Sequence, residues 1–196
     1  ADNYVTVENI EIEVTVKCPG HQYSSKVTKK PTETKKGEKT YTCQKCKDSY
    51  TEDIPMLEPT KPANVTGLKV KKNTSTSLTF TWKKVNGVNY RLAFYKGSKK
   101  VSTKYLKGNR YTYKKLKAAT GYTLKITPYR VVNGKNIYAP AAKQVKTATA
   151  PAAVKLKAVK KTGRSKVKLT WKKTTGATGY EIYMKTNNAG YKKILK

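Results

Sequence analysis

The sequence predicts an all-β protein in which a small β domain is followed by β-sandwich repeats. Three observations support this prediction. The Cys and His residues lie in closely spaced pairs near the start, the charge changes abruptly near residue 59, and a stretch that begins at Leu68 recurs at Leu156. Aromatic residues make up 10% of the chain, which separates it from disordered sequences that are poor in aromatics.

The change in charge divides the chain. Nine of the 43 basic residues and ten of the 11 acidic residues precede residue 59, so the first part carries −1. The rest holds 34 basic residues and one acid, Glu181, which gives +33. The Pro-rich sequence EPTKP, residues 58–62, supplies a linker at the same place. We therefore expect domains at residues 1–58, 59–149 and 150–196.

The first part contains the three cysteines and the single histidine of the chain. They form two hooks, Cys18-Pro-Gly-His21 and Cys43-Gln-Lys-Cys46, joined by a hairpin-length segment. This spacing is typical of a zinc ribbon, so Cys18, His21, Cys43 and Cys46 are predicted to bind one structural Zn²⁺. Two alternatives remain. A redox Cys-x-x-Cys pair would normally open a helix after a strand, and a disulfide framework would leave one cysteine unpaired.

The remainder of this part is predicted to form short strands. VTVENIEIEVTV, residues 5–16, alternates so that Ile10, Ile12, Val14 and Val16 share one face. KKGEK, residues 35–39, is predicted to be a turn, and TYTC and DSYTEDI are predicted to be strands. So small a core needs a staple, which the metal would supply.

The sequence PTETKKGEKTYTCQKCKDSYTEDIP, residues 31–55, also resembles a known repeat. Similar repeats occur in secreted, multi-repeat surface proteins of Gram-positive gut anaerobes. The resemblance covers about residues 18–55 and implies a secreted or cell-surface protein. It differs near Thr32 and Thr34, where such repeats often carry another cysteine.

Seven strands are predicted in the second part, near 65–71, 77–84, 89–96, 100–106, 110–115, 121–131 and 137–147. Turn residues separate them, and Asn133-Gly134 is the strongest hairpin signal. Alternation predicts an inward set of Leu78, Phe80, Trp82, Tyr90, Leu92, Phe94, Leu116, Tyr122, Leu124 and Ile126.

These strands carry the marks of one family. Pro62 opens the region, Trp82 lies on the second strand, Tyr90 on the third, and LKAATGYTLKI spans residues 116–126. The pattern resembles the fibronectin type III domain, an immunoglobulin-like β-sandwich, and implies that the Tyr122 phenol bonds backbone just upstream. The resemblance recurs in 151–196 and stops after a fourth strand. We therefore expect 150–196 to be the N-terminal half of a truncated second domain, within a longer protein.

No catalytic constellation is found in the sequence. The one histidine is assigned to the metal, and the basic region lacks the second carboxylate that acid/base pairs need. Nucleophile-elbow, phosphate-loop and dinucleotide motifs do not occur, so we expect no enzyme in these residues. No apolar stretch is long enough to span a membrane.

The charge of +33 predicts function through attraction, because solubility needs only about 2 to 8 charges on a small domain. We expect diffuse binding of anionic polymers such as teichoic acid or host glycans. Tyr95, Tyr113, Tyr129 and Tyr183 are predicted to be exposed and able to stack on sugars or bases. Non-specific nucleic-acid binding is an alternative, although lysine outnumbers arginine; accessory domains of a secreted carbohydrate-active enzyme, or a module with protein partners, are others.

Overall fold

The computed structural model describes residues 18–185 and 189–195, and all regular structure in them is β-strand. The all-β prediction is confirmed. The chain divides into two units, residues 1–59 and 60–196, which are described separately. The part that the structure describes has no helix long and apolar enough to cross a membrane. The strand predicted at 5–16, with Ile10, Ile12, Val14 and Val16, lies outside the described residues.

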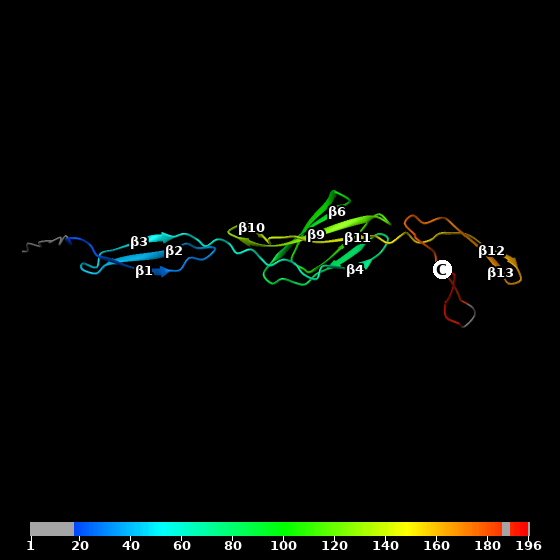
Figure 1. Ribbon diagram of the computed structural model, residues 1–196, viewed down its shortest axis with the longest axis horizontal. Helices are drawn as coiled ribbons and strands as arrows, with labels where there is room; N and C mark the ends of the chain where they lie inside the picture. The colour runs from blue at the N-terminus through cyan, green and yellow to red at the C-terminus, as the bar shows by residue number, and fades with distance from the viewer. Residues whose placement is uncertain (1–17, 186–188, 196) are drawn as a thin grey trace, which may run out of the picture. The chain divides into compact units, whose positions relative to one another are not determined.

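The first unit is an antiparallel three-stranded sheet in the order β1-β2-β3 (Figure 1). Its strands are β1 (Tyr23–Lys29), β2 (Gly37–Cys43) and β3 (Ser49–Ile54). The turn predicted at 35–39 is wrong in position, because β2 already begins at Gly37. A Cβ at Gly37 would lie 2.6 Å from the Lys29 carbonyl oxygen and the Pro31 nitrogen, so only glycine fits this approach.

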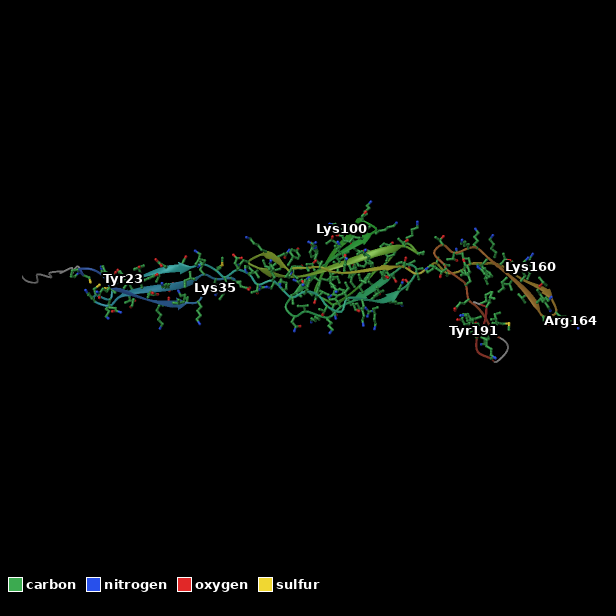
Figure 2. All side chains as sticks on the ribbon, in the orientation of Figure 1. Tyr23, Lys35, Lys100, Lys160, Arg164 and Tyr191 are labelled. Atoms are coloured by element: carbon green, nitrogen blue, oxygen red, sulfur yellow. The ribbon has the colours of Figure 1, made fainter. Side chains whose placement is uncertain are left out.

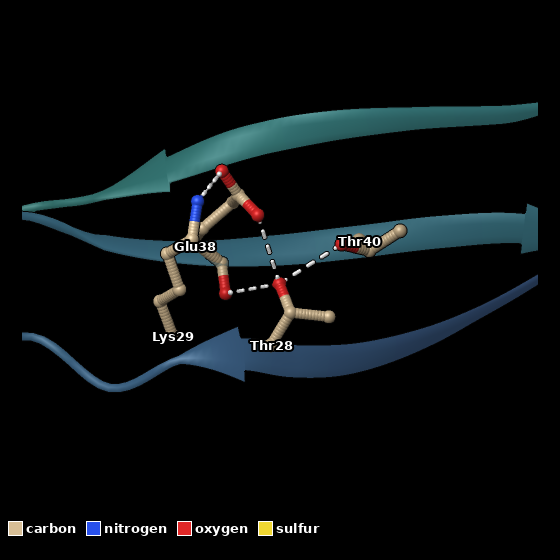
Figure 3. A network of polar contacts seen from close by, with 4 residues as sticks. All are labelled: Thr28, Lys29, Glu38 and Thr40. Carbon is tan, nitrogen blue, oxygen red and sulfur yellow. Dashed lines mark hydrogen bonds and ion pairs between the residues drawn. The ribbon is translucent and has the colours of Figure 1, made fainter.

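The two faces of this sheet differ. One carries tyrosine rings: Tyr41 stacks on Tyr50 with centroids 4.8 Å apart, and Tyr23 meets Tyr50 edge-on at 5.0 Å. The other carries polar side chains, where Thr28 Oγ1 lies 2.9 Å from Thr40 Oγ1 (Figure 3). Among the described residues of this unit, only Gly37 and Cys43 are buried. Burial alone therefore offers this sheet little stability.

The second unit begins with a sandwich of two antiparallel sheets, ordered β4-β5-β8 and β7-β6-β9-β10, with β11 also paired to β9 (Figure 1). The strands are β4 (Lys69–Asn73), β5 (Leu78–Thr81), β6 (Asn89–Lys96), β7 (Lys99–Leu106), β8 (Arg110–Tyr113), β9 (Gly121–Val132), β10 (Lys135–Tyr138) and β11 (Lys143–Ala148).

Two strand predictions need correction. The first strand, predicted at 65–71, is found at 69–73, and the last, predicted at 137–147, is split into β10 and β11. The split falls at residues 139–142, which include Pro140. Proline has no backbone N–H to donate, so it interrupts the ladder there.

The predicted inward residues form the core between the sheets. Nine of the ten are buried and Leu116 packs against them. Val65 and Tyr113 also belong to this core. The prediction that Tyr113 is exposed is wrong: it opposes Leu78 on β5, is 7% exposed, and stacks on Phe94 with centroids 3.8 Å apart. An inward position on β8 therefore decides its fate, because the sheet has only one solvent face.

Conserved geometry within the chain itself marks the internal repeat. Trp82 meets Tyr90 edge-on at 5.3 Å, and the Val85 N–H donates to the Tyr90 hydroxyl at 2.7 Å. The same pair recurs as Trp171 and Tyr180 at 5.4 Å. There the Thr174 N–H donates to the Tyr180 hydroxyl at 2.6 Å.

Two local predictions are confirmed in the sandwich. The Lys117 N–H donates to the Tyr122 hydroxyl at 3.2 Å, which is the predicted tyrosine corner. Asn133 and Gly134 have φ of 48° and 74°, the left-handed pair that a tight hairpin between β9 and β10 requires.

The repeat of residues 151–196 supplies four strands arranged as two pairs, β12-β13 and β14-β15. They are β12 (Leu156–Gly163), β13 (Lys166–Trp171), β14 (Ile182–Met184) and β15 (Lys192–Leu195). Leu156, Val159 and Val167 are about three-fifths exposed, at 59%, 61% and 60%. These strands thus leave apolar side chains in contact with solvent.

Candidate metal centre

The register of the first sheet brings the two hooks together. Cys43 ends β2 directly opposite Tyr23 at the start of β1, so the hook before β1 faces the hook after β2. The Gln44 N–H donates to the Gln22 carbonyl at 3.0 Å and ties the two hooks directly. Lys47 has φ of 64°, which lets the chain turn back so that the Cys43 N–H donates to the Asp48 carbonyl at 2.7 Å.

Four ligand atoms, one from each predicted residue, converge at this end of the sheet. The Sγ atoms of Cys18, Cys43 and Cys46 and a ring nitrogen of His21 all lie within 4.8 Å of one another. Cys18 Sγ is 4.0 Å from Cys43 Sγ, and Cys46 Sγ is 3.4 Å from His21 Nδ1. Bond lengths of about 2.3 Å to sulfur and about 2.0–2.1 Å to nitrogen give tetrahedron edges of about 3.8 and 3.5 Å. The cluster therefore has the size of a tetrahedral metal site.

The electrostatics favour one thiolate in particular. The backbone N–H of Cys46, helped by His21 and the Gln22 and Lys45 amides, lowers the pKa of the Cys43 thiol to about 5. Desolvation, with hydrogen bonds from Cys46 and Cys43, raises the pKa of Cys18 to about 11. Thiolate is the form that binds metals, so Cys43 is already prepared as a ligand, whereas Cys18 needs the metal to lose its proton.

The two alternative readings of the cysteines fit the structure less well. All three cysteines are free, and the 4.0 Å between Cys18 and Cys43 far exceeds a covalent S–S bond of about 2.05 Å. The element after Cys46 is strand β3, whereas a redox pair would open a helix. A four-ligand metal cluster is the reading that uses all four side chains.

An outer layer, which the sequence analysis did not identify, supports the cluster. The His21 ring stacks on Tyr23 at 5.3 Å with planes 17° apart, and the Tyr23 hydroxyl donates to Asp48 Oδ2 at 2.7 Å. This bond raises the pKa of Tyr23 to about 12. Side chains that fix a ligating imidazole orient it toward the metal. His-x-Tyr spacing in the sequence is the only signal that could have indicated this arrangement.

Thr32 and Thr34 take no part in the cluster. They lie in the turn before Gly37, at the end of β2 opposite Cys43. The Thr32 hydroxyl instead accepts the N–H of Lys35 at 3.0 Å and stabilises that turn. The Cys18 thiol is therefore the fourth ligand atom in this chain.

The second candidate site is the basic surface of the sandwich. Lysine side chains project into solvent along it, as Lys100 does in Figure 2. The one acid of this region, Glu181, binds Lys193 and accepts a hydrogen bond of 2.8 Å from Tyr183. Residues 59–149 contain no carboxylate side chain at all. Of the tyrosines predicted to be exposed, Tyr183 is 51% exposed, and Tyr95 and Tyr129 are half-buried.

A scan against protein-family models matches residues 63–147 to the fibronectin type III domain. Residues 63–147 form a fibronectin type III domain. Its Trp82, its tyrosine corner and its two sheets are those described above. A comparison with curated proteins finds no match.

Solved structures with similarity to the chain include fibronectin type III domains. The sixth such domain from human fibronectin type III domain containing protein 3 is 22% identical over 48% of this chain and 92% of its own, with a TM-score of 0.41. Domains d3-d4 of the rat CD45 extracellular region are 16% identical over 76% of this chain and 83% of theirs, with a TM-score of 0.42.

Proposed function

We propose that these residues form a non-catalytic module of a secreted or cell-surface bacterial protein, which acts as a spacer and adheres to anionic wall or host polymers. The charge distribution carries the proposal. After residue 59 there are 34 basic residues and one acid, and that acid is held by Lys193 and Tyr183. The lysines of the sandwich have no carboxylate of their own domain to pair with, so their field acts on external anions.

We further infer that the cluster of Cys18, His21, Cys43 and Cys46 holds a structural Zn²⁺. Its donor set of three thiolates and one imidazole is one that zinc prefers, and four protein ligands leave no position for a substrate. The ion would cross-link the two ends of a sheet that buries only Gly37 and Cys43 among its described residues. The metal would thus stabilise the first unit and would not perform chemistry.

The binding expected of this surface is diffuse. Lysines are distributed over the strands and turns of the domain, and a lysine ammonium attracts anions without fixing their orientation. Removal of any single lysine should change affinity little, whereas reversal of several on one sheet should change it strongly.

The test uses the full chain with wall teichoic acid, heparin and duplex DNA at about 50 and 200 mM salt, a range in which counterion-driven binding weakens strongly. We expect all three polymers to bind at the lower salt and to be released at the higher. Native mass spectrometry of the same sample should show one zinc ion per chain. Salt-insensitive binding of one polymer would contradict diffuse adhesion, and a chain without metal would contradict the zinc assignment.

A further inference from the structure

The outer face of the β7-β6-β9-β10 sheet carries a row of tyrosines. Tyr105 on β7 opposes Arg91 on β6, and Tyr129 on β9 opposes Tyr138 on β10. The ring centroids of Tyr105 and Tyr129 are 5.9 Å apart, and those of Tyr129 and Tyr138 are 5.4 Å apart. Because Tyr90 and Leu92 point into the core, Arg91 and its cross-strand partners lie on the opposite, solvent face.

This row is accessible and carries positive charge. Tyr105 is 57% exposed, and the Arg91 guanidinium carbon lies 5.3 Å from the Tyr138 ring centroid. Further along the same face, Lys125 Nζ lies 5.3 Å from the Tyr95 ring. Cation–π contacts of this kind hold the cations beside the rings. The face therefore offers flat apolar rings and cations side by side.

An open groove of about 520 Å³ lies at the end of this row. Asn89 lines it and also opposes Tyr129, so the groove begins where the row ends. Lys84 and Lys107 contribute ammonium groups to its walls. Arg130, also in the lining, donates from Nε to the Thr60 carbonyl at 2.8 Å and is held in place.

We propose that this face binds an acidic polysaccharide, with sugar rings on Tyr105, Tyr129 and Tyr138 and a carboxylate or sulfate group in the groove near Lys84 and Lys107. The inference rests on the proposed function and names its preferred polymer and place. A pyranose ring presents an apolar face that packs on an aromatic ring, and a tyrosine hydroxyl adds a polar contact at its edge. The absence of any carboxylate from residues 59–149 makes the charge complementary to such a chain.

Other anionic polymers use the face less fully. A polyol phosphate, such as the backbone of teichoic acid, has no ring to place on the tyrosines. A nucleic acid has rings, but its phosphates are best held by bidentate arginine. The groove instead presents lysines, and its Arg130 already binds Thr60.

The first experiment compares full-length variants with heparin and with inorganic polyphosphate, a ringless polyanion, at equal low salt. The double variant Tyr105→Thr, Tyr138→Thr removes two rings without a change in charge, and Tyr191→Thr, at a site 74% exposed outside the row, is its matched control. We expect the double variant to bind heparin about tenfold more weakly, about 1.4 kcal/mol, and polyphosphate as before. Circular dichroism verifies that each variant is folded.

The second experiment locates the anionic group. Lys84→Gln with Lys107→Gln should weaken heparin binding several-fold more than Lys69→Gln with Lys72→Gln, which removes the same charge from exposed positions on β4. Equal losses in the two pairs, or equal losses of heparin and polyphosphate in the tyrosine variant, would overturn the site. A larger loss for single-stranded oligothymidylate than for heparin would overturn it in favour of nucleic acid. If the wild-type chain bound no polyanion at all, the proposed function itself would fail.

Discussion

Truncation of Trp82 to alanine tests the core of the fibronectin type III domain. The Trp82 side chain is 3% exposed and meets Tyr90 edge-on at 5.3 Å. Removal of a buried tryptophan typically costs about 3–5 kcal/mol, of which an aromatic pair contributes about 0.5–1.5 kcal/mol. Because Trp82 Nε1 is buried without a hydrogen-bond partner, its removal also relieves a desolvation cost, and we expect a loss near 3 kcal/mol.

Urea denaturation of the full chain, followed by circular dichroism, measures this loss. Fluorescence is unsuitable because Trp82 is itself one of the two tryptophans that would report it. A loss of about 3 kcal/mol should lower the melting temperature of the domain by about 12–24 °C, since each kcal/mol shifts a domain of this size by about 4–8 °C.

Trp82→Phe is the matched control. It keeps an aromatic ring next to Tyr90 and deletes the unpartnered N–H, so its cost should stay below about 1.5 kcal/mol. A loss below about 1 kcal/mol for Trp82→Ala, the scale of an ordinary surface substitution, would show that the ring does not hold the two sheets together as described.

Three further predictions concern single interactions. Tyr122→Phe removes the hydroxyl that accepts the Lys117 N–H and should cost about 1 kcal/mol in urea denaturation; no change would mean that the tyrosine corner does not stabilise the domain. A chelator that removes the metal should collapse the amide resonances of residues 18–55 in NMR spectra and leave those of 62–148 in place; an unaltered first unit would mean that it folds without metal. Hydrogen bonds from Lys29 and Thr28 lower the pKa of Glu38 below its ordinary 4.5, so this contribution to stability is present at neutral pH and is lost as pH falls below 4.5 through the folded pKa (Figure 3); Glu38→Gln should remove that part of the acid sensitivity, and an identical acid profile would refute the assignment.

The sandwich could be predicted from the sequence because one face of each strand is buried. Alternation then places Phe80, Trp82 and Leu92 inward without knowledge of the partner strand. Tyr113 escaped the prediction because tyrosine suits both faces of a sheet. Only its pairing opposite Leu78 decides that it points inward.

Strand β1 could not be predicted, because its residues carry no apolar alternation. All seven residues of YSSKVTK are exposed, so no buried face left a pattern in the sequence. Its pairing with β2 is set by the backbone and by polar contacts such as Thr28 with Thr40.

The four residues of the metal cluster could be predicted from spacing alone, since each hook places two ligands on one turn. The supporting contacts could not. The stacking of His21 on Tyr23 and the bond from Tyr23 to Asp48 depend on the register that sets Tyr23 opposite Cys43. Such contacts join residues that are distant in sequence, and no local pattern encodes them.

The salt dependence of polyanion binding tests the central claim most directly. Duplex DNA is the most informative polymer for the full chain, because each neutralised phosphate adds about 0.9 to the log–log slope of affinity against salt. Diffuse binding by a surface of +33 should give a slope of several units and a loss of about 10³-fold between about 50 and 200 mM salt. A slope near zero with retained affinity would contradict the claim, because the binding would then depend on a shaped pocket and not on the summed charge.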